Sequence, residues 1–424
     1  MADTTGARSA PGTNIDPSNY RWAVVGLWMV ASVSGFMVVS TLGILLPAIS
    51  AELSLSPAKQ GLLGSAAFWG NITLALPMSW WTSRFGARRL TAVTMVLSTV
   101  ALFVQGWAPA FAVLLAGRLA FGITIIARQP ARVMLTQQWF APREFVLVNS
   151  LSNVLFGLVV GGGLLAAPFI LAAFGDSWRA TLNTSAGLFA ALTLLWILFG
   201  RERRTVETRP EGLTRDFGVI RGALSYRDLW IAGAGFLGAN FAWSAFLSFY
   251  PTLMLDTYGV ALTLSGAILA VGIAVGGGVG LGFGLWVMKR GNTKALLRVL
   301  GVLMVITYIG MTVTGSIPAL MVLTVLNGIA WGFWPLLFTV PFHLPGIRPR
   351  EVAVAAAFIM MNASIGGALG PLAAGFLQEA LGGLRQALLI ISFTSLTLTV
   401  AGIVLRTSGQ SQAEQASASA AGDQ

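Results

Sequence analysis

The stretch RERRTVETRPEGLTRDFGVIRGALSYRD, residues 201–228, is the longest hydrophilic segment in the interior of the chain and divides it into two apolar parts. On both sides, apolar runs of about 20 residues recur, and each is long enough to cross a hydrocarbon core about 30 Å thick. The runs predict six membrane spans before the stretch and six after it: 22–49, 58–81, 90–107, 109–135, 148–173, 180–199, 229–255, 262–288, 296–313, 317–341, 352–377 and 386–405.

The composition is that of a polytopic helical membrane protein. Hydrophobic residues make up 56% of the 424 residues and charged residues only 10%, with a mean hydropathy of +0.79. An average soluble domain carries about 25% charged residues. We therefore predict an all-α membrane protein with twelve transmembrane helices. Its parts are a polar tail at 1–20, six-helix bundles at 21–200 and 229–406, a linker at 201–228 and a disordered tail at 407–424.

The net charge of +11 is distributed as membrane topology requires. Lys and Arg are concentrated before the first span, in the linker and in the loops on the same side, while Lys59, Arg179 and Arg385 lie on the other side. Because positively charged loops stay in the cytoplasm, we predict an inner (plasma) membrane protein with both termini cytoplasmic. The charge therefore indicates topology and not a nucleic-acid partner. The chain has no cysteine, which excludes thiolate metal sites, and we expect no cofactor.

Three landmarks of the first half recur in the same order in the second half. SRFGARR at 83–89 follows the second span and MKRGNTK at 288–294 follows the eighth, with Gly86 and Gly291 in equivalent positions. Two further pairs are Pro142-Arg143-Glu144 with Pro349-Arg350-Glu351, and Asn153-x-x-x-Gly157 with Asn362-x-x-x-Gly366. The repeated order predicts two pseudo-symmetric halves.

A parallel repeat of six spans around a cytoplasmic linker resembles the plan of the major facilitator superfamily. The loop signature of that family is Gly-x-x-x-Asp-Arg-x-Gly-Arg-Arg, and SWWTSRFGARR at 79–89 is similar to it, although serine stands at the positions of the first glycine and of the acid. The resemblance implies alternating access around a substrate site between the halves, near the midplane. It also implies that spans 5 and 8 face each other across the halves, as do spans 2 and 11, along glycine-rich seams.

The same resemblance predicts a gating group at the loop motif. In the family, the acid of this motif latches the two halves in one state, whereas Ser83 has no carboxylate. We expect a weaker latch, or one assembled from Glu144 and Arg84. The expected members of the group are Arg84, Gly86, Arg88, Arg89, Glu144 and Gly291. The alternative is that residues 84–89 only anchor the chain on the cytoplasmic side.

The stretch GRLAFGITIIARQPARVMLTQQWF, residues 117–140, places three arginines in a span that contains no acid. Every Asp and Glu of the chain falls in a predicted loop, tail or helix end. A charged group at depth costs about 2.5–3.5 kcal/mol and usually marks a pathway or a pair, and guanidinium offers oxyanions a flat, bidentate fork. We predict that Arg118, Arg128 and Gln129 bind an anionic substrate on a face that looks into water. Arg132 is expected at the interface, and for Arg118 bonding to backbone carbonyls is the alternative.

Two spans of the second half are predicted to complete the substrate site. The resemblance implies that the spans at 229–255 and 317–341 line the cavity opposite the arginines. Their candidate residues, which offer amide hydrogen bonds and aromatic walls, are Asn240, Trp243, Asn327, Trp331 and Trp334. The alternative for the aromatic residues is ordinary helix packing.

These features predict a secondary transporter of a small anion, either an organic carboxylate or a compact oxyanion, that works as a monomer in the lipid bilayer. Without an intramembrane acid, exchange, uniport, and symport with a proton carried by the substrate all remain open. A proton-coupled exporter of hydrophobic compounds is the alternative, although the buried acid and the glycine-proline signature of such exporters are missing. An enzyme is not expected, because the chain has one histidine, no cysteine and no deep acid.

Overall fold

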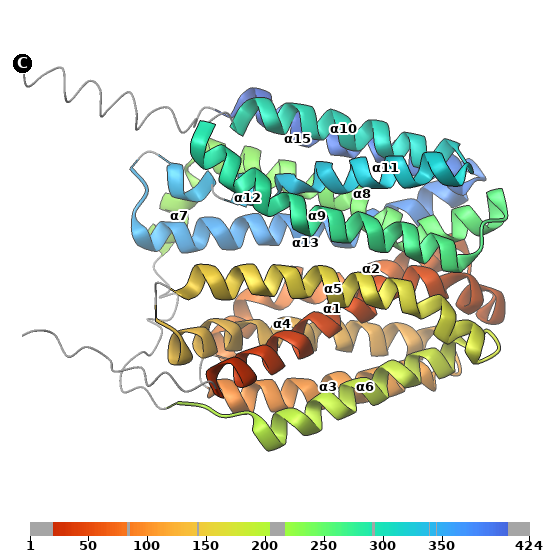
Figure 1. The fold of residues 1–424 in the computed structure, drawn as a ribbon, viewed down its shortest axis with the longest axis horizontal. Helices are drawn as coiled ribbons and strands as arrows, with labels where there is room; N and C mark the ends of the chain where they lie inside the picture. Colours follow the sequence, from red (N-terminus) through yellow and green to blue (C-terminus); the bar gives the residue numbers. More distant parts are fainter. Residues whose placement is uncertain are drawn as a thin grey trace, which may run out of the picture.

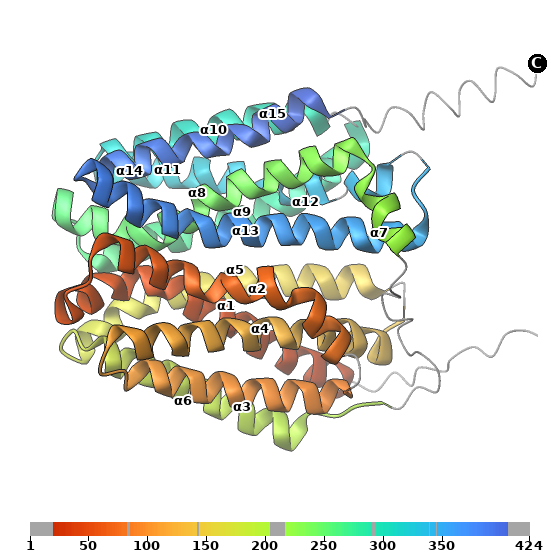
Figure 2. The same cartoon turned by 180° about the vertical axis from the view of Figure 1, so that it is seen from behind.

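The computed structural model describes residues 20–405 except 83–84, 142–143, 204–216, 291–292, 339 and 345. The described chain forms two stacked helical bundles, which Figure 1 and Figure 2 show from opposite sides. The first bundle consists of α1 (Tyr20–Leu53), α2 (Pro57–Thr82), α3 (Ala87–Gly106), α4 (Phe111–Trp139), α5 (Phe145–Ala173) and α6 (Trp178–Phe199). The second consists of α8 (Arg227–Tyr258), α9 (Leu262–Arg290), α10 (Thr293–Val313), α11 (Ile317–Ala330), η2 (Trp331–Phe333), α12 (Trp334–Phe338), η3 (Val340–His343), α13 (Pro349–Leu381), α14 (Leu384–Ser392), η4 (Phe393–Ser395) and α15 (Leu396–Val404).

The predicted all-helical membrane fold is confirmed. Eleven helical segments of the described chain are long and apolar enough to cross a membrane. Helix α2 is not among the eleven, although it has 26 residues and occupies the predicted place of the second span. The short helix α7 (Phe217–Leu224) lies between the bundles in sequence and packs against α13. We call the end of the bundles at which α7 lies the linker end, and the other the far end (Figure 1).

Two predicted spans are interrupted by single 3-10 turns. The tenth span runs from α11 through η2 into α12, and the twelfth from α14 through η4 into α15. In the tenth, the backbone N–H of Trp334 bonds to the Trp331 carbonyl in the tighter 3-10 pattern. Pro335 follows directly and has no N–H to donate. The proline therefore accounts for the local change in helix type.

The two bundles meet along three helix pairs: α2 with α13, α5 with α9, and α1 with α8. Glycine permits the closest approaches, because a side chain would collide with the backbone of the other half. A Cβ on Gly61 of α2 would lie 2.5 Å from the carbonyl oxygen of Pro371 on α13. A Cβ on Gly266 of α9 would overlap the carbonyl oxygen of Leu164 on α5. The pairing of spans 2 with 11 and 5 with 8, expected from the family resemblance, is therefore present.

Along α5 and α9 the contact is closest toward the far end. Leu164 meets Gly266 there, and Gly161 approaches Ala270 with a Cβ-to-carbonyl distance of 3.4 Å. One turn closer to the linker end, a Cβ on Gly157 would meet nothing within 4 Å. The α5–α9 seam thus loosens from the far end toward the linker end.

Candidate functional site

Helix α4 carries Arg118 into the interior of the first bundle. The side chain is 1% exposed, and its Nη2 donates a hydrogen bond of 2.9 Å to the carbonyl oxygen of Val39 on α1. Its Nε and Nη1 have no partner among the residues that the structure describes. Arg118 therefore satisfies part of its hydrogen-bonding capacity with the backbone of a neighbouring helix.

Arg128 is also fully buried and has fewer partners. It is 0% exposed, and none of its three guanidinium nitrogens has a hydrogen-bond partner in the described part of the chain. The ring of Phe189 on α6 lies 5.9 Å from the guanidinium carbon, within the range of a cation–π contact. On α1, a Cβ on Gly35 would lie 3.6 Å from Nη2. The head group of Arg128 is thus enclosed between α1, α4 and α6.

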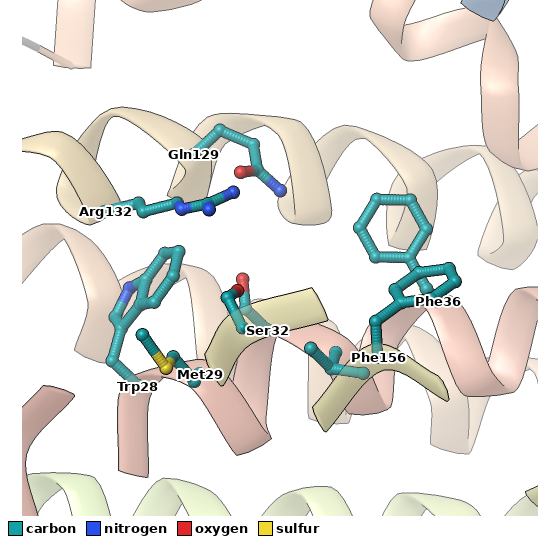
Figure 3. Close-up of a pocket in the computed structure, with 9 residues that line it drawn as sticks. Trp28, Met29, Ser32, Phe36, Gln129, Arg132 and Phe156 are labelled. Carbon is teal, nitrogen blue, oxygen red and sulfur yellow. The ribbon is translucent and has the colours of Figure 1, made fainter. Parts of the chain in front are cut away.

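Gln129 and Arg132 line a partly open cavity between α1, α4 and α5, shown in Figure 3. The cavity measures about 90 Å³, several times the roughly 10–15 Å³ that one water molecule requires. We call it the α1–α4–α5 cavity; its lining residues are Trp28, Met29, Ser32, Val33, Phe36, Gln129, Arg132, Ser152 and Phe156.

The expectation that the arginine-bearing face of α4 looks into water is wrong for Arg118 and Arg128, which are fully buried against α1. Arg132 lines the cavity, and its expected place at the membrane interface stays a prediction. Helical spacing places the three residues on one broad side of α4, but α1 covers that side at two of the three positions. Contacts with α1 therefore decide which guanidinium reaches open space.

The carboxylates of the described chain that form ion pairs sit at helix ends. Glu144 precedes α5 and pairs with Arg21 at 3.1 Å, Glu52 at the end of α1 pairs with Arg179, and Glu351 lies in the first turn of α13. None of these pairs involves Arg118 or Arg128. The charges of these two arginines are therefore not neutralised by a carboxylate in the described ion pairs.

The predicted residues of the second half have contacts within that half. Asn240 donates to the Phe236 carbonyl oxygen on its own helix at 2.9 Å. Asn327 donates to the Thr307 hydroxyl at 2.9 Å. The structure brings Trp243 and Trp331 together, with ring centroids 5.7 Å apart.

Trp331 also donates its indole N–H to the Tyr308 hydroxyl at 3.1 Å. Trp334 is 37% exposed and packs edge-on against Phe236. The α1–α4–α5 cavity is lined by neither residue. Trp243 borders the same apolar cluster as Phe36 and Phe156, and this cluster connects the two halves.

Of the predicted gating group, Arg84 and Gly291 lie outside the described residues. Glu144 bonds to Arg21 and also accepts from the backbone N–H of Ala141 at 3.0 Å. Arg88 donates to the Ile197 carbonyl oxygen at 3.2 Å, which ties the start of α3 to the end of α6. Arg89 is exposed. The proposed Glu144–Arg84 latch therefore stays a prediction.

Glu202, which the sequence reasoning did not select, occupies the position next to Gly86. Its carboxylate accepts from the backbone N–H of Ala87 at 2.9 Å and of Arg88 at 3.4 Å, at the start of α3. It also accepts from the Gln138 side chain of α4 at 3.4 Å. A Cβ on Gly86 would lie 2.5 Å from this carboxylate. A linker residue thus supplies an acid next to the motif in which Ser83 replaces one.

Sequence reasoning also missed the α1 and α5 contributions to the cavity. Trp28, Ser32 and Phe36 lie on one side of α1 at spacings of four residues, which is a helical face. Arg132 follows Gln129 by three residues on α4 and shares its face. These spacings were visible in the sequence, but nothing in them indicated which face is open.

Comparison with known proteins places this chain among membrane transporters. Residues 28–362 match the protein family described as the Major Facilitator Superfamily. The probable galactarate/D-glucarate transporter GarP of Escherichia coli (strain K12) is 22% identical over 407 residues, covering 85% of this chain and 89% of that protein. The hexuronate transporter of Bacillus subtilis (strain 168) is 22% identical over 386 residues, covering 87% and 90%.

Among solved structures, the fold is similar to that of a bacterial homologue of the human lysosomal transporter Spinster, in an inward-facing and unoccupied conformation. The TM-score is 0.79 at 17% identity, and the match covers 92% of this chain and 98% of that chain.

Proposed function

Because the chain belongs to the Major Facilitator Superfamily, we propose that it is a secondary transporter that moves a small anion across the inner membrane by alternating access, with arginines of α4 as its anion-binding groups. The protein is a membrane transporter and not an enzyme. Two relatives are named as transporters of galactarate/D-glucarate and of hexuronate, which are organic acids. Their names support an anionic cargo for this chain.

The proposal rests on the burial of Arg128 and on the missing hydrogen-bond partners of its head group among the described residues. A fully buried guanidinium with no hydrogen-bond partner among the described residues is costly, since a charge removed from water needs a partner. A transporter can retain such a charge because it attracts the cargo. A structural arginine would be expected to bond to surrounding carbonyls, as Arg118 partly does.

The three arginines of α4 have different roles in this proposal. Arg132 and Gln129 contact the anion, because they line the cavity. Arg128, one helical turn away, and Arg118 lie behind the cavity wall and make the local potential positive. The aromatic pair Trp243 and Trp331 of the second half is not among the described lining residues of this cavity, and its contact with the anion stays a prediction.

Reconstituted transport tests the proposal. Purified protein in proteoliposomes is assayed with a panel of labelled organic acids and oxyanions. We expect saturable anion flux that Arg128→Gln abolishes and that Arg128→Lys, which keeps the charge but loses the fork, partly retains. Arg298→Gln is the matched control, because Arg298 is exposed on α10.

Two results would contradict the proposal. One is wild-type anion flux in Arg128→Gln at normal expression. The other is flux of lipophilic cations without any anion flux, which would favour the export of hydrophobic compounds instead.

A further inference from the structure

The α1–α4–α5 cavity has a polar part and an apolar part. In Figure 3 the side chains of Arg132 and Gln129 lie on the α4 wall, and the hydroxyl of Ser32 points toward them from α1. The rings of Phe36 and Phe156 lie together farther along the cavity. The lining therefore differs in chemistry from one part to the other, and a ligand that fits it must differ in the same way.

The polar part is rich in hydrogen-bond donors. The arginine side chain can only donate and the glutamine amide nitrogen also donates, and both Arg132 and Gln129 line the cavity. Ser32 is 5% exposed, and its hydroxyl has no hydrogen-bond partner among the described residues. These donors, together with the positive charge of Arg132, match a ligand group that is an acceptor with negative charge.

The apolar part offers no such donors. Phe36 and Phe156 meet edge to face with ring centroids 5.9 Å apart, and Val33 lies beside them in the lining. A hydroxyl or a second carboxylate placed here would lose its water without gaining a partner. A flat apolar group would instead pack against the two rings.

We infer that the cargo is a monocarboxylate with an apolar, preferably aromatic, body. This inference rests on the proposed function and narrows its substrate class. A second carboxylate would have to lie in the apolar part of the cavity, where none of the described lining residues offers it a donor. The inferred cargo differs from the diacids and polyhydroxylated acids that the names of the relatives specify. A polyhydroxylated body would leave its hydroxyls against phenylalanine rings.

The test compares four anions on the same proteoliposomes: benzoate as the aromatic monocarboxylate, glucuronate as the polyhydroxylated monocarboxylate, galactarate as the diacid and nitrate as the compact oxyanion. We expect benzoate flux with a half-saturation concentration at least tenfold below that of glucuronate. Preference for glucuronate, galactarate or nitrate would overturn the inference and leave the anion transporter intact. Absence of flux with all four anions would overturn both.

Variants locate the effect in the cavity. Phe156→Leu should raise the half-saturation concentration for benzoate about threefold to tenfold, the size of an aromatic contact. Phe169→Leu is the matched control on the same helix, because the Phe169 ring is 58% exposed, and it should behave as wild type. Equal effects of the two substitutions would overturn the assignment of this cavity.

Arg132→Gln should weaken benzoate binding more than tenfold, since a charge-assisted bond is lost. The readout is the thermal shift that benzoate gives to the detergent-purified protein. This measurement needs folded protein but no transport, so a variant that has lost conformational cycling is still scored. An unchanged benzoate shift in folded Arg132→Gln would overturn the inference.

Discussion

At the scale of single residues, substitution of Arg128 can distinguish a role in stability from a role in transport. Its buried head group has no hydrogen-bond partner among the described residues, and replacing buried charges by apolar side chains of similar size often stabilises a protein by about 1–4 kcal/mol. We therefore expect Arg128→Met to raise the melting temperature of the detergent-purified protein while abolishing anion transport. Thermal unfolding and proteoliposome uptake measure the two effects.

Arg118→Met is the matched control for this prediction. Arg118 donates to the Val39 carbonyl oxygen, so its loss removes a real bond as well as a buried charge, and the gain in stability should be smaller. If Arg128→Met instead lowers the melting temperature by as much as a lost buried ion pair would, Arg128 is a structural element and its role in transport fails.

The indole nitrogen and the ring of Trp331 contact different residues, so their contributions can be tested separately. Its indole N–H bonds to the buried Tyr308 hydroxyl, and its ring meets that of Trp243. Trp331→Phe keeps a ring and should lower the free energy of unfolding by about 1 kcal/mol, with little change in half-saturation. Trp331→Ala removes the ring and should weaken transport as well. Equal transport kinetics for both variants would exclude Trp331 from the cargo site.

At the scale of elements, the start of α3 depends on a side chain from the linker. Glu202 accepts from two backbone N–H groups there, at the positive end of the helix dipole. Glu202→Ala should cost about 0.5–2 kcal/mol of stability, as other lost caps do. Thermal unfolding in detergent measures the loss, with Glu379→Ala, exposed near the end of α13, as the control. An unchanged melting temperature would show that the cap contributes nothing.

Gly86 leaves the space that this carboxylate fills. A Cβ at residue 86 would lie 2.5 Å from the Glu202 carboxylate, so Gly86→Ala should displace it and reproduce much of the effect of Glu202→Ala. Because both changes break one contact, the double variant should be little less stable than either single variant. Strictly additive losses would mean that Gly86 matters for another reason, such as its backbone.

The helices and their pairing could be predicted from the sequence, whereas the cavity could not. Apolar length and charge placement determine the spans, and the family resemblance implied which spans meet across the halves, along glycine-rich runs such as the one that contains Gly266. Whether a position on α4 borders a cavity depends on the helix packed against it. Helix α1 covers α4 at Arg128, and Arg132 lines the cavity. Glu202 reaches Ala87 across 115 positions of sequence, and no local pattern predicts such a contact.

At the scale of the whole molecule, the α5–α9 seam between the two bundles is tightest toward the far end. Alternating access requires this contact to open while the linker end closes. The chain has no native cysteine, so introduced pairs report this motion without background. A Cβ on Gly161 would lie 3.9 Å from the Cα of Ala270, which is compatible with the geometry of a disulfide.

We therefore expect the pair Gly161→Cys and Ala270→Cys to cross-link rapidly under mild oxidation and to stop transport until a reductant is added. The matched pair Gly157→Cys and Ala274→Cys lies one turn nearer the linker end, where a Cβ on Gly157 meets nothing within 4 Å. It should react slowly at rest and faster when cargo drives turnover, because the linker end then closes. Rates that cargo leaves unchanged in both pairs, or transport by the cross-linked protein, would contradict a rocking motion of the two halves.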